Sequence, residues 1–169
     1  MEHEVAMKWV AALRSGDYGQ CRGSLRTREG DNLGNEFCCL GVLCDVFAKE
    51  HPEAHWVSDE ETIRKGRIRN PCINAAMFVP GSKEIGTPAI GDTYEATSSL
   101  PTQVCSWSGL RDRNGMFFLD EAEFDPQELK ETVQMHLGES NVCLTALNDF
   151  EKWSFSEIAD FIETNYKIL

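Results

Sequence analysis

The chain has 169 residues, a formal net charge of −12, and 41% hydrophobic and 26% charged residues. This length and composition are typical of one globular domain, and we expect a single domain over residues 1–169. No apolar run approaches the roughly 18 residues that a membrane span needs, and the acidic start lacks the order of a secretory signal, so the sequence predicts a cytoplasmic protein without membrane contact.

Helical spacing of apolar residues predicts a first helix over residues 4–15. Glycine and arginine dominate residues 14–30, which predicts a loop that contains one short strand, and residues 31–35 are predicted as a turn. A second helix is predicted over residues 36–47, ended with the help of Pro52. Its buried stripe is predicted to be Leu40, Leu43, Cys44 and Phe47.

Residues 75–79 and 116–119 are short apolar runs beside glycine or proline, so they are predicted strands that could pair with each other. Residues 80–99 are predicted to be an ordered surface excursion. Residues 100–107 suit a short helix with proline in its first turn, which places Val104 and Trp107 inward.

Three helices are predicted towards the C-terminus, over residues 126–137, 141–149 and 154–166. Ser154 and Glu157 stand at the spacing of a capping box, which predicts the start of the last helix. Its buried stripe is predicted to be Ile158, Phe161 and Ile162. The elements together predict an α+β fold, mainly short α-helices with a small antiparallel sheet or hairpin.

Seven cysteines are scattered among apolar neighbours, at positions 21, 38, 39, 44, 72, 105 and 143. An odd number without framework spacing predicts reduced, mostly buried thiols in a reducing compartment. The cysteines and histidines do not stand at the spacing of a zinc site, so no metal site is predicted.

Five segments of the chain carry a shared pattern: Trp9–Arg26, Phe37–Asp45, Leu100–Leu110, Leu147–Asp149 and Ser154–Glu163. In this order they resemble a family of small phage and prophage proteins, with W-V-x-A-L-R-S-G-x-Y, C-C-L-G-V-L-C-D, L-N-D and S-F-x-E-I-A-D-x-I-E among its motifs. Cys21 departs from the family pattern, where glycine or lysine is more usual, and residues 50–100 form an insertion individual to this chain. The resemblance implies a viral or virus-derived origin and an accessory role in the host cytoplasm, and it supplies no catalytic residue.

A cysteine nucleophile is one enzymatic hypothesis, because Cys38 or Cys39 lies at a helix start, where the helix dipole lowers a thiol pKa. A short similarity to the D-C-S-G-L-V helix of NlpC/P60 peptidases supports it. The mechanism also needs a histidine oriented by a third group, and no histidine stands in a recognisable motif. The histidines are His3, His51, His55 and His136. Packing of a core helix is the favoured role for these cysteines.

Carboxylates offer a second enzymatic hypothesis, with Asp45, Asp149 and Asp160 as candidates for metal binding or general base chemistry. Asn148 and Asp149 fall where a helix is predicted to end, and side chains of this kind bond nearby backbone there. Capping is therefore the role that the sequence predicts for both. The common catalytic motifs are absent, so no catalytic residue and no cofactor are predicted.

The strongest candidate binding feature is a run of arginines among Gly16, Gly19 and Gly23. Glycines permit close backbone approach and arginines fork onto phosphate oxygens, so the segment could hold a nucleotide or another anion. Trp9 and Tyr18 could stack on a base. The predicted ligand-binding residues are Trp9, Arg14, Tyr18, Arg22, Arg26 and Arg28. The alternative is a solvated loop whose arginines neutralise the acidic C-terminal half.

That acidic half is pronounced: residues 1–72 carry ten Lys/Arg against twelve Asp/Glu, a net of −2, and residues 73–169 carry six against sixteen, a net of −10. A total of this sign argues against direct nucleic-acid binding. It also supports an alternative function, a nucleic-acid mimic that blocks a DNA-binding protein. The residues behind that alternative are Asp120, Glu121, Glu123, Asp125, Glu128 and Glu131.

The sequence favours a non-enzymatic binding protein of phage type that acts on a host component, such as a defence system. It would occupy a protein surface or sequester a small anionic ligand such as a nucleotide. A cysteine-dependent hydrolase and the acidic nucleic-acid mimic stay open as alternatives. The oligomeric state also stays open.

Overall fold

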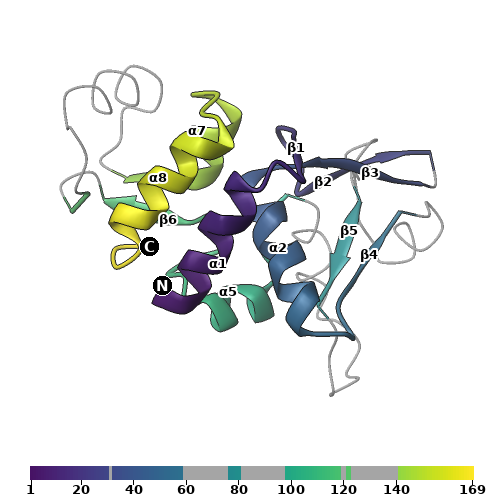
Figure 1. Ribbon diagram of the computed structural model, residues 1–169, viewed down its shortest axis with the longest axis horizontal. Helices are drawn as coiled ribbons and strands as arrows, with labels where there is room; N and C mark the ends of the chain where they lie inside the picture. Colours follow the sequence, from purple (N-terminus) through teal and green to yellow (C-terminus); the bar gives the residue numbers. More distant parts are fainter. Residues whose placement is uncertain (31, 59–75, 81–97, 119–120, 123–140) are drawn as a thin grey trace.

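The computed structural model describes residues 1–30, 32–58, 76–80, 98–118, 121–122 and 141–169 (Figure 1). Within these ranges the chain forms five helices and three small sheets. The helices are α1 (His3–Arg14), α2 (Cys39–Glu50), α5 (Thr102–Ser108), α7 (Leu144–Asp149) and α8 (Phe155–Asn165). The α+β prediction is therefore confirmed.

The first sheet contains β1 (Gly19–Gln20), β2 (Arg26–Glu29) and β3 (Asn32–Phe37) in the order β1-β3-β2. Strand β1 runs parallel to β3, and β2 runs antiparallel to it. Two further antiparallel pairs are β4 (His55–Val57) with β5 (Met77–Val79), and β6 (Met116–Phe118) with β7 (Asn141–Cys143). Figure 1 shows β2 and β3 extending away from the helices, with β4 and β5 on the same side of α2.

The start of α2 differs from its prediction. Helix α2 begins at Cys39 instead of residue 36, because Glu36 and Phe37 belong to β3 and pair with β1. Residues 31–35 were predicted as a turn, and this was wrong from Asn32 onward, since these residues pair with β2. Pairing across strands satisfies the backbone N–H and C=O groups there, and local periodicity does not report it.

The predicted pairing of residues 75–79 with residues 116–119 was also wrong. Strand β5 pairs with β4, and β6 pairs with β7. Because residues 141–143 form β7, the helix predicted from residue 141 begins at Leu144. The predicted helix over residues 126–137 and most of the surface excursion over residues 80–99 lie outside the described residues.

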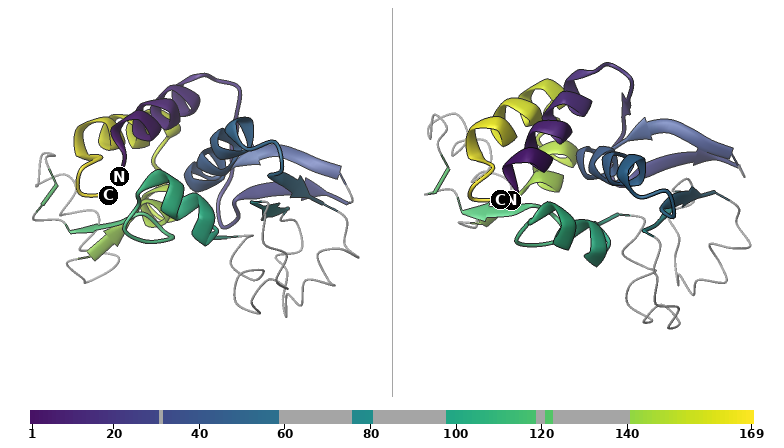
Figure 2. Two further views of the ribbon diagram at one scale, coloured as in Figure 1. Left: turned by 90° about the horizontal axis from the view of Figure 1, so that it is seen from below. Right: turned by 60° about the horizontal axis from the view of Figure 1, so that its bottom comes forward.

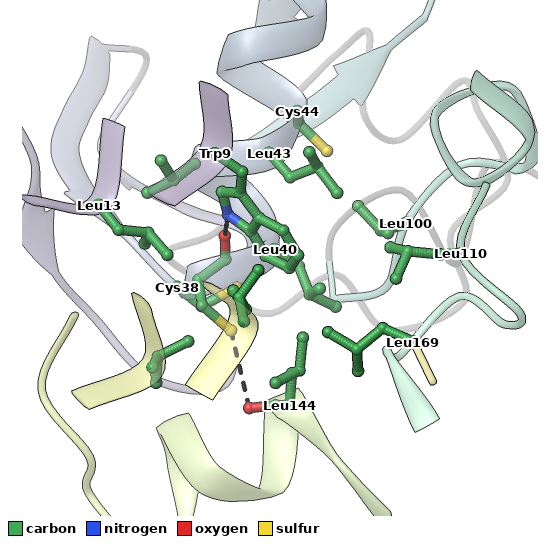
Figure 3. Packing of buried hydrophobic residues seen from close by; sticks show 14 of the residues in the cluster. Trp9, Leu13, Cys38, Leu40, Leu43, Cys44, Leu100, Leu110, Leu144 and Leu169 are labelled. Atoms are coloured by element: carbon green, nitrogen blue, oxygen red, sulfur yellow. Dashed lines mark hydrogen bonds between the residues drawn. The ribbon is translucent and has the colours of Figure 1, made fainter. Parts of the chain in front are cut away.

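Trp9 lies at the centre of the hydrophobic core (Figure 3). Its side chain is fully buried, and its indole Nε1 donates a hydrogen bond to the Cys39 backbone oxygen at 2.9 Å. This bond ties α1 to the first turn of α2. Helix α8 lies alongside α1, and the views of Figure 2 show the two chain ends next to each other. The predicted buried stripes of α2 and α8 are confirmed.

The α-amino group of Met1 donates to the Tyr166 backbone oxygen at 2.7 Å, which holds the two chain ends together. Arg14 adds a second tie between α1 and α8, because its Nη2 atom lies 2.5 Å from Asp160 Oδ1 and 2.6 Å from Glu163 Oε2. These side chains are partly exposed, so most of the stability of this helix pair comes from the buried stripes between them.

Gly41 allows α2 to press against the backbone of Leu25. A Cβ atom added at Gly41 would lie 1.7 Å from the Leu25 carbonyl oxygen. That carbonyl also accepts a hydrogen bond from the Cys38 backbone N–H at 3.2 Å. The close approach fixes the position of the arginine-rich segment on the first turn of α2.

We expect Gly41→Ala to destabilise the protein by roughly 4 kcal/mol or more, because backbone atoms on both sides would have to move. Gly16→Ala is the matched control: Gly16 has open space around it and a φ of +78°, so it should lose only about 1–2 kcal/mol. Urea denaturation of both variants measures the difference. Similar midpoints for the two variants would contradict the close contact.

We expect Ser154→Ala to destabilise the protein by about 1 kcal/mol through loss of the N-cap bond. The predicted capping box is confirmed, since the Glu157 N–H donates to Ser154 Oγ and the Ser154 N–H donates to Glu157 Oε2 at 2.7 Å. Ser156→Ala, an exposed position in the first turn of the same helix, should leave the urea midpoint unchanged. Equal midpoints for Ser154→Ala and wild type would show that the cap bond contributes nothing.

Candidate anion-binding site

Aromatic and charged side chains gather around Phe37, at the end of β3. The rings of Tyr18 and Trp56 meet the Phe37 ring edge to face, with centroids 5.1 and 5.8 Å away. The guanidinium of Arg26 lies 4.6 Å above the Phe37 ring and 5.5 Å from the Trp56 ring. We call this group the Phe37 cluster, and its members are Tyr18, Arg26, Phe37, Asp45, Lys49 and Trp56.

Asp45 of α2 orients the polar members of the Phe37 cluster. Its carboxylate accepts hydrogen bonds from the Tyr18 hydroxyl at 2.7 Å and from Trp56 Nε1 at 3.3 Å. Lys49, one helical turn further on, donates to the Tyr18 hydroxyl at 2.7 Å. Burial raises the pKa of Tyr18, and the hydrogen bond to Tyr18 raises the pKa of Lys49, so the phenol stays neutral and the amine stays charged.

Arg26 is partly withdrawn from water. Its Nε atom donates to the Gly34 backbone oxygen at 2.8 Å, and burial lowers the pKa of its guanidinium, an effect that the charge of Asp45 partly opposes. Cation–π contacts with Phe37 and Trp56 hold the guanidinium in place. No carboxylate is hydrogen-bonded to Arg26 within the described ranges.

Arg28 lies deeper than Arg26, with 8% of its surface exposed. Its Nη1 atom donates to the backbone oxygens of Gly30 and Ser58, at 3.1 and 3.2 Å. Its Nε atom is buried and has no hydrogen-bond partner among the described residues. Because Arg26 stacks on Trp56 and Arg28 bonds Ser58, both guanidinium groups lie on the side of β2 that faces β4.

The arginines of residues 14–28, together with Arg111, divide into two groups by partner. Arg14 and Arg111 form ion pairs with carboxylates. Arg22, Arg26 and Arg28, in the described part of the chain, bond backbone oxygens and aromatic rings only. In a chain with a net charge of −12, three arginines without a bonded carboxylate leave donors for an external anion.

The six predicted ligand-binding residues do not form one site. Trp9 is a core residue whose full burial leaves no face for a base to stack on. Arg14 pairs with α8, as expected of an arginine that neutralises the acidic half. Arg22 donates to the Asn148 backbone oxygen at 3.2 Å. The structure brings Tyr18 and Arg26 together and places Arg28 beside them.

Three members of the Phe37 cluster were missed in the sequence: Phe37, Lys49 and Trp56. Asp45 was considered there only for metal binding or general base chemistry. Asp45 and Lys49 stand four positions apart, which places them on one helix face. That spacing was the available signal. The sequence contains no such signal for Trp56, because Trp56 reaches Asp45 only through the pairing of β4 with β5.

Asn148 was predicted to cap its own helix, and this was wrong. Its amide Nδ2 donates to the Cys21 backbone oxygen at 2.9 Å, and its Oδ1 accepts from Gln20 Nε2 at 2.9 Å. The side chain is fully buried. It joins α7 to the segment that follows β1 and so supports the position of the arginine-rich chain.

The cysteines at the start of α2 lack the properties of a nucleophile. Burial raises the pKa of Cys38 to about 12 and the pKa of Cys39 well above its usual value, so desolvation outweighs the helix dipole. The Cys39 thiol donates to the Leu144 backbone oxygen at 3.6 Å. Among the described histidines, the polar and ring partners of His3, His51 and His55 do not include a cysteine.

We expect Cys38, Cys39 and Cys44 to resist alkylation until the protein unfolds. A thiol of pKa about 12 is deprotonated at pH 8 in roughly one molecule in 10⁴, and these three side chains are at most 2% exposed. Iodoacetamide labelling followed by peptide mass spectrometry measures each position, and the half-buried Cys143 supplies an internal comparison. Labelling of Cys38 as fast as Cys143 would contradict the assigned burial.

In the described ranges, no three His, Cys, Asp or Glu side chains gather where they could hold a metal ion, and no helix there has the length and apolar character needed to cross a bilayer. The fold and the cluster thus define an α+β protein with desolvated arginines beside an aromatic platform. Residues 1–166 match the family described as "Domain of unknown function (DUF8296)", and the chain belongs to that family. No curated protein and no solved structure matches the chain.

Proposed function

We propose that this protein is a non-enzymatic binding protein that sequesters a small anionic ligand on the side of β2 that faces β4. The observation that carries the proposal is the state of Arg26 and Arg28, two desolvated guanidinium groups with no carboxylate bonded to them in the described residues. The resemblance to phage proteins adds the biological setting, an accessory role in the host cytoplasm directed at a host component.

The burial of Arg28 favours this proposal over the alternative of a solvated loop. A solvated arginine keeps its hydration, whereas Arg28 is 8% exposed and its Nε atom has no hydrogen-bond partner among the described residues. Withdrawal of a charged group from water costs several kcal/mol unless an opposite charge is bound. A bound anion would offset that cost at Arg28 and Arg26 together.

Occupation of a protein surface is the second candidate function. Phe150, at the end of α7, has 68% of its surface exposed. Lys152, in the same turn, adopts a φ of +60°, which is uncommon for a residue with a side chain. Exposed aromatic residues serve as anchors in protein interfaces, so this turn supports a contact with a host protein.

The two remaining alternatives have less support. A cysteine-dependent hydrolase needs a thiolate, and burial raises the pKa values of the thiols at the start of α2. The nucleic-acid mimic rests on acidic residues between 120 and 131, of which Glu121 alone lies in the described ranges and pairs with Arg111.

Calorimetry with nucleotides, sugar phosphates, carboxylates and inorganic anions tests the sequestration proposal. We expect Arg26→Ala to lower the affinity for the tightest-binding anion about 10- to 100-fold, which is the loss typical of one charge-assisted hydrogen bond. Arg14→Ala is the control, since Arg14 is bound to α8 carboxylates and its removal should leave anion affinity unchanged.

The stability of Arg26→Ala must be measured beside its affinity. Arg26 packs on two aromatic rings, so its removal should also lower the free energy of unfolding by about 1 kcal/mol. A folded variant that binds as wild type, or a wild-type protein that binds no anion at millimolar concentration, would overturn the sequestration proposal. The protein-surface function would then be the one to pursue.

A further inference from the structure

Arg26 and Arg28 both contact the short segment that contains Trp56 and Ser58. Arg26 lies over Trp56, and Arg28 bonds the backbone oxygen of Ser58, two positions further along the same segment. Arg26 and Arg28 are alternate residues of β2, and alternate side chains of an extended strand point to the same side. A tetrahedral oxyanion bound on that side could accept charge-assisted hydrogen bonds from both guanidinium groups.

The charge of the site favours a doubly charged group. Two guanidinium groups contribute two positive charges, and the negative charge of the nearby Asp45 is balanced by Lys49, whose Nζ atom lies 3.6 Å from Asp45 Oδ2. At pH 7 a phosphate monoester carries a charge of about −1.5 to −2. A carboxylate or a phosphodiester carries a single negative charge and would leave one guanidinium uncompensated.

We propose that the site binds the terminal phosphate monoester of a small metabolite, held between Arg26 and Arg28. This inference rests on the proposed sequestration function and names the chemical class of its ligand. A nucleoside monophosphate and a sugar phosphate both present this group. The guanidinium of Arg26 lies beside this position with the rings of Phe37 and Trp56 next to it, and bases pack on guanidinium planes and aromatic rings.

Calorimetry on the full chain at pH 7.5 separates these ligands, with AMP, ribose 5-phosphate and cyclic 3′,5′-AMP as probes. We expect AMP to bind at least tenfold tighter than cyclic 3′,5′-AMP, because the cyclic diester carries the same base with one negative charge fewer. If ribose 5-phosphate binds with an affinity similar to that of AMP, the ligand is assigned to sugar phosphates. If ribose 5-phosphate binds at least tenfold more weakly than AMP, the ligand is assigned to nucleotides.

Arg28→Met tests the role of the buried guanidinium. If Arg28 serves the ligand, the variant should lose at least tenfold in AMP affinity while its melting temperature stays the same or rises, because an uncompensated buried charge is removed. If Arg28 is a structural residue that holds the Gly30 and Ser58 carbonyls, the melting temperature should fall. That fall, with AMP affinity unchanged, would overturn the inference.

Arg26→Lys supplies a second variant that preserves charge, in case Arg28→Met does not fold. It should bind AMP about tenfold more weakly, because lysine lacks the planar fork, yet it should still prefer AMP over the cyclic diester. Arg14→Met is the matched control and should bind as wild type. Equal affinity of wild type for AMP and the cyclic diester would overturn the monoester inference and leave anion sequestration standing. The absence of binding to every probe would overturn both.

Discussion

The contact between α2 and the backbone of Leu25 is the constraint on which the rest of the structure depends. Only a residue without a side chain permits it, since a Cβ atom at Gly41 would overlap the Leu25 carbonyl oxygen. The contact fixes the arginine-rich segment against the first turn of α2. Asp45, one turn beyond Gly41, thereby reaches Tyr18 on one side and Trp56 on the other.

Features that depend on neighbours within one helix were predictable. The capping box of α8 and the buried stripes of α2 and α8 follow from spacings of three and four residues, and the structure confirms them. The strands β5 and β6 were also predicted, but their pairing was not predictable in this way, because each pairs with a partner 20 or more residues away. Local periodicity carries no information on which distant segment completes a pair.

The sequence predicted which segment of the chain holds the candidate site, but not which of its arginines lie together in the fold. Arginine and glycine marked residues 14–30 as the place for an anion, and Arg26 and Arg28 remain candidates there. The same composition could not separate them from Arg14, whose partners on α8 lie about 150 positions away. Arg26 and Arg28 differ from Arg14 in their burial and, among the described residues, in having no bonded carboxylate. Both properties arise only when β2, β3 and β4 are assembled.

The segment from Phe37 to Asp45 is the most unusual in the sequence, and most of it serves packing. Cys38, Cys39 and Cys44 are buried at the interfaces of α2, and Gly41 makes room for the Leu25 backbone. Asp45 differs because its carboxylate accepts hydrogen bonds from Tyr18 and Trp56 and so orients both residues around Phe37. A change at the cysteines would therefore act on stability through the core. A change at Asp45 would act on Tyr18 and Trp56 beside Arg26, and so on the proposed anion site.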